Sequence, residues 1–280
     1  MTTEVKRLDP KEIRKVRHKW EVPLFALCVI MSVFVLIIIA FLFIPEVAAA
    51  LEDTDYDAST LIFMIIAIAV VMIVMMHYQY AQIRARSVRV TEKNFPEIYH
   101  KMEEFAQKLG MKQTPLVYIE QRDGLMNALA NAILGQRRYS QISAEIVDIA
   151  YMENKDFAPA YFVLAHEFAH IYFNHVKISH VLLTFIGKLI PIFGPMYSRS
   201  REYSCDRLAQ LLTESDGFEA MIPMWVGRHL YKYVDKEDYL TDKKDSGIFS
   251  WVFNLLASHP IPPKRFAALV DPAKKDGKLF

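Results

Sequence analysis

Two histidines and a glutamate near the middle of the chain have the spacing of metal ligands on one helix. Within the segment 161–175, YFVLAHEFAHIYFNH, they spell H-E-x-x-H at His166, Glu167 and His170. Residues i and i+4 share a helix face, so both imidazoles can bind one tetrahedral Zn²⁺ while Glu167 acts as a base on a water molecule. The residues around them are mostly apolar, which predicts a buried metal site with hydrolytic chemistry.

A catalytic zinc site needs a third protein ligand, and a later helical stretch offers a carboxylate. The extended motif H-E-x-x-H-x-x-G-x-x-H does not continue here, because Phe173 and Val176 replace its glycine and third histidine. His175 is one residue out of register for that role. Glu202 and Asp206 lie four residues apart, so Glu202 can ligate zinc and Asp206 can hold a ligating histidine by its other ring nitrogen. Taken alone, this pair also fits an ordinary charged surface helix.

Composition limits the other classes of site. The 280 residues contain 33 Lys and Arg against 32 Asp and Glu, and this balance gives no electrostatic basis for binding nucleic acid. Two cysteines, Cys28 and Cys205, cannot build a disulfide framework or a four-cysteine metal site. Cys205 adjoins Asp206, so a metal contact or an oxidation site there stays open.

Two uncharged runs of 23 residues, 22–44 and 58–80, predict a transmembrane hairpin within 22–83. A helix of that length is about 34 Å long, enough to cross a hydrocarbon core of about 30 Å. The basic segment 1–21 precedes the first run and further Arg and Lys follow the second, whereas the loop 45–57 is acidic. The positive-inside rule then places both termini in the cytoplasm and the loop outside. The alternative is a pair of buried helices in a soluble domain.

The remaining residues, 84–280, have the size of one domain. Helical spacing of apolar residues predicts a helix near 96–109, and the β-rich runs 116–120 and 138–143 predict a small sheet. After residue 158 the pattern is mainly helical. The domain is therefore expected to be α+β and mainly helical.

One further apolar stretch, 181–197, lies between the two metal motifs. It cannot be a single membrane crossing, because His170 and Glu202 must reach the same ion and so lie on the same side. Gly and Pro residues divide it into two pieces too short to cross. We expect a membrane-dipping or surface-lying hairpin, with a buried helical hairpin of the domain as the alternative.

Four motifs in this order after two spans resemble the HtpX-type membrane zinc metallopeptidases, relatives of the CAAX prenyl endopeptidases. Besides H-E-x-x-H and the pair Glu202 and Asp206, the segment 127–130 (NALA) is similar to the family's edge-strand motif. Ser258-His259-Pro260 with Arg265 is similar to its His-Pro-x-x-x-x-Arg motif. The chain departs from the HtpX members at 181–197, where they have two membrane segments.

The resemblance implies a gluzincin-like zinc-metalloprotease domain with one Zn²⁺ per chain. The residues it assigns are His166, His170 and Glu202 for the metal, Asp206 beside a ligating histidine, Glu167, His259 and Arg265 for catalysis, and Asn127, Ala128, Leu129 and Ala130 for substrate binding. The strand would bind a substrate backbone through main-chain hydrogen bonds, and His259 would donate a hydrogen bond to the oxyanion.

The expected function is that of a membrane-anchored zinc endopeptidase, with both termini and the catalytic domain cytoplasmic. It would act on polypeptides in or near the bilayer of the cell or cytoplasmic membrane, and the resemblance implies a role in protein quality control. Prenyl-peptide specificity is not expected, because two spans cannot build the helical chamber of those relatives. The alternatives are a zinc-bound membrane chaperone or scaffold without proteolytic activity, and a hydrolase of soluble substrates that is merely tethered to the membrane.

Overall fold

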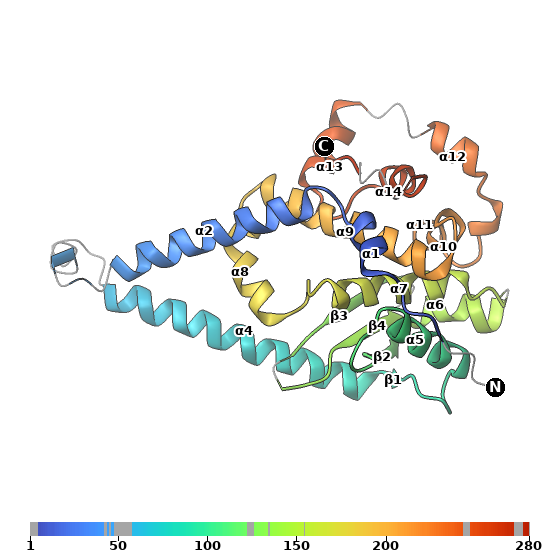
Figure 1. Ribbon diagram of the computed structural model, residues 1–280, viewed down its shortest axis with the longest axis horizontal. Coiled ribbons are helices and arrows are strands. Elements are labelled where there is room, and N and C mark those ends of the chain that lie inside the picture. Colours follow the sequence, from blue (N-terminus) through green and yellow to red (C-terminus); the bar gives the residue numbers. More distant parts are fainter. Residues whose placement is uncertain are drawn as a thin grey trace.

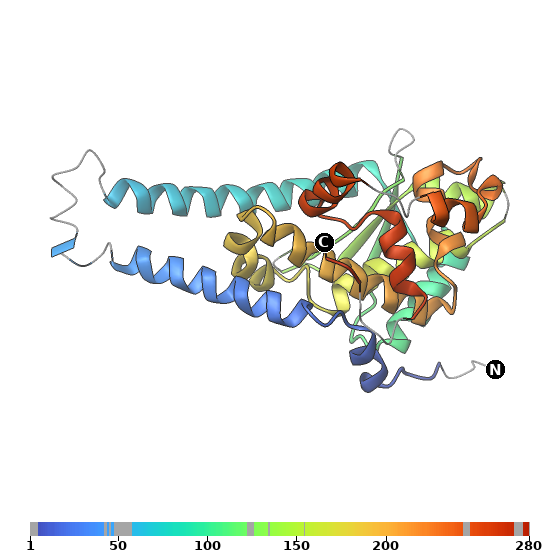
Figure 2. The same ribbon diagram turned by 90° about the horizontal axis from the view of Figure 1, so that it is seen from above.

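Two long helices project from a globular part in the computed structural model, which describes residues 5–41, 44, 46–47, 58–121, 126–133, 135–153, 155–242, 247–271 and 277–279. Figure 1 shows α2 and α4 extending away from the domain, and Figure 2 shows the same pair from above. Their bounds are Glu21–Phe41 and Ala58–Arg86. Most of the predicted acidic loop 45–57 lies outside the described residues.

The length and composition of α2 and of the Ile62–Arg86 part of α4 allow each to cross a membrane. The residues that α2 buries are Glu21, Leu24, Cys28 and Ser32, which follow helical spacing along one face. Most of the other apolar side chains of both helices are exposed. Exposed apolar helices of this length are incompatible with the alternative of two buried core helices, and they are what a bilayer would cover.

A four-stranded mixed sheet lies on one side of the globular part, with the helices of residues 193–269 on the other side (Figure 1). Its order is β1 (Val88–Arg89), β2 (Leu116–Glu120), β4 (Tyr139–Ser143) and β3 (Ala128–Asn131). Strands β2 and β4 are parallel, whereas β3 runs antiparallel to β4, with Leu129 opposite Gln141. Strand β3 therefore ends the sheet, and its outer edge pairs with no other described strand.

Helices make up most of the domain, as its sequence pattern predicts. They are α1 (Pro10–Val16), α5 (Pro96–Lys108), α6 (Ala144–Asp148), the π-helical turn Ile149–Glu153, α7 (Ala158–Tyr172), α8 (Ile178–Leu189), α9 (Phe193–Thr213), α10 (Phe218–Met221), α11 (Pro223–Val226), the 3-10 turn Tyr231–Tyr233, α12 (Lys236–Asp242), α13 (Ile248–Leu256) and α14 (Pro262–Leu269). Helix α7 is central, because it packs against α9, α5 and β3. Its fully buried Phe162, Leu164 and Phe168 lie in the main core. The α+β, mainly helical fold class is confirmed.

Helix α8 runs along α2. Gly187 allows this approach, because a Cβ atom at that position would lie 2.5 Å from Sγ of Cys28. The hydroxyl of Ser32 also donates a hydrogen bond to the carbonyl of Leu183 at 2.7 Å. The apolar stretch 181–197 thus begins within α8 and ends in the first turns of α9, as a helical hairpin beside the first span.

The outer face of α8 remains apolar and open. Leu182 and Leu189 are exposed there, as is Ile192 in the turn that joins α8 to α9. This exposure supports the membrane-dipping interpretation over a fully buried hairpin, although contact with lipid stays a prediction.

Candidate metal centre

Two packed helices bring the three predicted zinc ligands together. Helix α7 carries His166 and His170 one turn apart, and α9 carries Glu202 on the facing side. Nε2 of His166 lies 3.2 Å from Nε2 of His170. The Glu202 carboxylate lies 3.3 Å from Nε2 of His166 through Oε2 and 3.5 Å from Nε2 of His170 through Oε1.

These separations fit a tetrahedral zinc ion. Ligand bonds of about 2.0–2.1 Å place neighbouring donor atoms of a tetrahedron about 3.3 Å apart. The distances between the donors of His166, His170 and Glu202 scatter around that value. Two imidazoles and a carboxylate are also a donor set that zinc prefers, and His166 and Glu202 are buried. The residues present therefore suit the metal predicted from the sequence.

Asp206 and Arg265 lie behind His166. Oδ1 of Asp206 is 2.9 Å from Nδ1 of His166, close enough for a hydrogen bond although the two groups are not well aligned for one. Arg265, on α14, donates from Nε to Oδ2 of Asp206 at 2.7 Å, and both residues are buried. Burial alone would raise the pKa of Asp206, but the guanidinium of Arg265 holds it below the usual value. Asp206 therefore stays ionised beside His166.

Glu167, also on α7, lines a cavity together with His166 and Glu202. Burial of its side chain raises its pKa to about 7, against the opposing influence of His166. A carboxylate with a pKa near neutrality can both accept and return a proton at physiological pH. This is the behaviour required of the general base that the H-E-x-x-H motif predicts.

The other ring nitrogen of His170 contacts a second buried histidine, and the sequence did not reveal this contact. Nδ1 of His170 lies 3.0 Å from Nδ1 of His175, and Nε2 of His175 lies 2.9 Å from Oε1 of Glu21 at the start of α2. Burial lowers the pKa of His175 to about 3, so this imidazole is neutral. One signal for this contact was present in the sequence. Glu21 is a lone carboxylate at the start of an apolar span, and such a group needs a partner when it is buried.

Cys205 packs against His175. Its Sγ atom lies 3.7 Å from Nδ1 of His175, and the two residues form a cluster of possible donors with His170. Burial raises the pKa of the Cys205 thiol well above its usual range, and a protonated thiol is a poor metal ligand. A metal ion in this cluster would have to bind Nδ1 of His170, whereas Nε2 is the atom of His170 that faces Glu202. The contact is therefore better explained as packing around His175.

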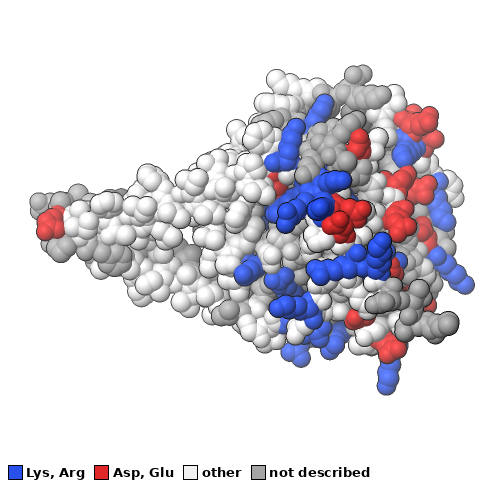
Figure 3. Space-filling view, viewed as in Figure 1, with Lys and Arg blue, Asp and Glu red and all other residues white. Residues whose placement is uncertain are grey.

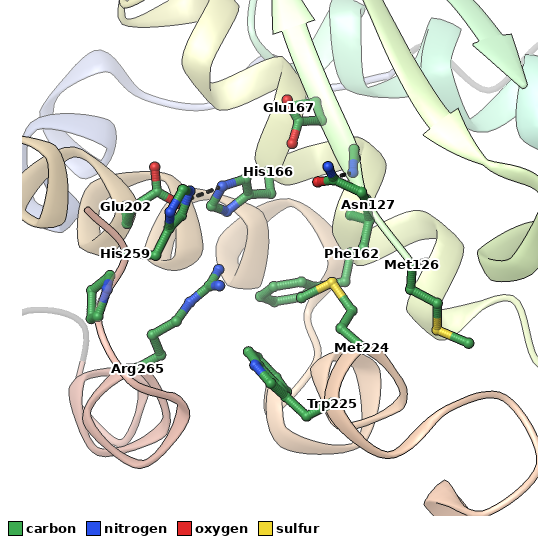
Figure 4. A pocket seen from close by; sticks show the side chains of 13 residues that line it. Met126, Asn127, Phe162, His166, Glu167, Glu202, Met224, Trp225, His259 and Arg265 are labelled. Carbon is green, nitrogen blue, oxygen red and sulfur yellow. Dashed lines mark hydrogen bonds and ion pairs between the residues drawn. The ribbon is translucent and has the colours of Figure 1, made fainter. Parts of the chain in front are cut away.

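A cavity of about 280 Å³ opens beside the metal ligands. Figure 4 shows His259 and Arg265 along one side and Phe162, Met224 and Trp225 along another. Phe162 comes from α7, whereas Met224 and Trp225 come from the short helix α11. This apolar wall was not predicted, and no local pattern in the sequence around Met224 and Trp225 points to a site.

The edge-strand residues divide between two sides of β3. Asn127 and Ala128 line the cavity beside the metal ligands. Leu129 instead lines a second hollow, which it shares with Ile83 and Arg86 near the end of α4. Ala130 is half-buried. Alternating side chains of a strand point to opposite faces, which explains this division.

His259 stands at the mouth of the cavity. Its side chain is 66% exposed, and its Nε2 lies 3.7 Å from Oε2 of Glu202. The adjacent Pro260 also lines the cavity. The motif that the sequence analysis singled out for this region thus lies within reach of the ligand carboxylate.

Comparison with known proteins agrees with this geometry. Two overlapping segments, 92–187 and 177–273, match the model of Peptidase family M48. They cover H-E-x-x-H, Glu202 and Arg265, and together they span well over half of the 280 residues. No curated protein and no solved structure matches the chain. With the two apolar helices that precede this region, the match shows that the chain belongs to peptidase family M48, the HtpX-containing family of zinc metalloendopeptidases.

Proposed function

We propose that the protein is a membrane-anchored endopeptidase that cleaves membrane or membrane-proximal polypeptides at the His166, His170 and Glu202 site. The observation that carries this proposal is the joint position of three elements. His166 and Glu202 of the donor triad line a cavity, the edge strand β3 borders that cavity, and two exposed apolar helices leave the same domain.

The chain's own residues account for the proton transfers of peptide hydrolysis. When bound, one zinc ion per chain would polarise the scissile carbonyl and activate a water molecule for attack. Glu167 accepts the proton of the attacking water and returns it to the leaving amine. Asp206, held by Arg265, fixes the orientation of His166. His259, which lies 3.7 Å from the Glu202 carboxylate, would donate a hydrogen bond to the developing oxyanion.

Strand β3 is the proposed binding site for the substrate backbone. A peptide added to its outer edge would form main-chain hydrogen bonds, which carry little sequence preference. Asn127 and Ala128 stand at the end of that edge nearest the metal ligands. Ala128 and Ala130 share one face of the strand, and their small side chains take up little of the space over that face.

The apolar wall of the cavity favours a substrate residue of matching chemistry. Phe162, Met224 and Trp225 present aromatic and thioether groups, and a volume of about 280 Å³ accommodates one apolar side chain. Such residues are abundant in membrane proteins and are exposed when those proteins misfold. This supports, without testing, the role in protein quality control that the resemblance implies.

Matched substrates test the proposal. A membrane-inserted model substrate and its detached soluble domain would be incubated with the protein in liposomes, with and without a zinc chelator. The proposal requires chelator-sensitive cleavage of the inserted substrate by the wild-type chain and none by Glu167→Gln. Equal cleavage of the detached domain would instead favour a tethered hydrolase of soluble proteins. Zinc binding with no cleavage of either substrate would favour a scaffold.

A further inference from the structure

Helix α13 has an unusual surface for a helix of a globular domain. Its sequence, IFSWVFNLL from Ile248 to Leu256, contains no charged residue. Phe249 is 86% exposed, Ile248 71% and Phe253 65%. On the inner side, Asn254 and Leu255 are the residues that it buries. Contiguous exposed apolar surface of this kind marks an interaction site, because in water it would be unfavourable.

The position of α13 identifies the partner. Figure 1 and Figure 2 both place α13 at the end of the domain that faces the spans, level along the long axis with the start of α2. Figure 3 shows an uncharged surface over the projecting helices and Lys and Arg gathered where these helices join the domain. Basic residues at that level are typical of the boundary between a bilayer and water. The apolar surface of α13 thus lies at the boundary that the two spans would define.

We propose that α13 is an interfacial helix that lies in the surface of the same bilayer that α2 and α4 cross. Its exposed side chains are embedded at the boundary between headgroups and acyl chains, with Trp251 and Phe249 as aromatic anchors. The proposal rests on the proposed membrane insertion of α2 and α4, but it does not depend on proteolytic activity.

Contacts on the inner side connect this helix to the metal centre. Arg199, fully buried on α9 one turn before Glu202, donates hydrogen bonds to the carbonyls of Leu255 at 3.0 Å and Ala257 at 2.6 Å. Ala257 is the C-cap residue of α13 and precedes His259, which stands at the mouth of the cavity, by two residues. Docking of α13 on the bilayer therefore restrains the segment that carries His259 and orients the mouth with respect to the membrane.

Site-specific fluorescence in the whole 280-residue chain tests this inference. Both natural cysteines are buried, so a thiol-reactive, polarity-sensitive fluorophore would label an introduced surface cysteine selectively. The variants are Phe249→Cys on α13, Val70→Cys at an exposed position of α4, and Met152→Cys at an exposed apolar position on the π-helical turn. Each would be reconstituted in liposomes that contain nitroxide-labelled phospholipids, with the nitroxide either near the headgroup or deep in the acyl chain.

The expected result is a blue-shifted label at position 249, quenched several-fold more by the shallow nitroxide than the label at position 152. The label at position 70 should respond best to the deep nitroxide, which verifies that α4 is inserted. The proposal would be overturned if neither nitroxide quenched the fluorescence of the label at position 249 while the label at position 70 was quenched. Energy transfer between labels at 249 on separate chains, without lipid quenching, would show that a second copy covers α13 instead. Failure at position 70 would refute the spanning helices and, with them, the basis of this inference.

Discussion

Oε1 of Glu21 lies 2.9 Å from Nε2 of His175 and so connects the first apolar span to the metal centre. The other nitrogen of His175 faces Nδ1 of His170 at 3.0 Å. If Nε2 of His170 binds zinc, its Nδ1 carries the proton and donates to His175, whose Nε2–H then donates to Glu21. The same carboxylate is held by Arg17 and Ser204. One consistent set of tautomers therefore links the membrane helix to a proposed zinc ligand.

Removal of this carboxylate should weaken zinc binding. Glu21→Ala leaves His175 without its acceptor, and we expect zinc affinity to fall by about 10–100-fold, the usual cost of losing support behind a ligand. Glu21→Gln keeps an acceptor oxygen and should have a smaller effect. Competition titration against a zinc-chelating dye measures both. Glu12→Ala, at an exposed carboxylate of α1, is the control, and unaltered affinity in Glu21→Ala would show that the contact only supports packing.

Loss of a ligand and loss of the base should have different consequences. His166→Ala leaves two of the proposed ligands and should yield protein with little zinc by metal analysis. Glu167→Gln should retain about one zinc per chain and lose turnover, because an amide cannot accept the proton of the attacking water. Cleavage at the wild-type rate by Glu167→Gln would mean that another group is the base.

The two carboxylates of α9 should differ in the same way. Glu202→Ala removes a proposed ligand and should abolish most zinc binding at ordinary zinc concentrations. Asp206→Ala keeps all three proposed ligands and removes a carboxylate that His166 shares with Arg265, so zinc affinity should fall by about 10–100-fold and excess zinc should restore part of the activity. Full zinc content in Glu202→Ala would refute the proposed ligand set, whatever the fate of the protease assignment.

The ion pair between Arg265 and Asp206 should be important for stability as well as activity. Both side chains are buried, so Arg265→Ala leaves an uncompensated carboxylate and should cost about 3–5 kcal/mol of unfolding free energy. The double variant with Asp206→Ala should recover part of that loss. Denaturant unfolding of the zinc-free proteins measures the coupling. An additive double variant would show that the pair contributes no interaction energy.

Reporter fusions should establish the orientation of the hairpin. Lys and Arg flank both spans and the loop between them is acidic, so reporters at either terminus should report cytoplasm. A reporter inserted near Asp55 should report the opposite side. Labelling of the C-terminus from outside would reverse the orientation and place the catalytic domain on the other face of the membrane.

Local patterns in the sequence determined the elements whose physics is local. The H-E-x-x-H spacing places His166 and His170 on one face of any helix, and 23 uncharged residues are long enough to span a bilayer in any tertiary setting. The same helical periodicity predicted that Glu202 and Asp206 lie on one face of a helix. The strands 116–120 and 138–143 were predicted from their composition and turn signals, and β2 and β4 confirm them.

Tertiary packing decided what lies behind and beside these residues. Glu21 and His175 are 154 positions apart, and Arg265 reaches Asp206 across 59 positions, so neither contact follows from spacing along the chain. The approach of Trp225 to the cavity and the outward face of α13 depend on how short helices of the C-terminal region pack on α9 and α7. The physical reason is that periodicity specifies which face of an element is apolar or reactive, whereas the packing of distant elements specifies what that face meets.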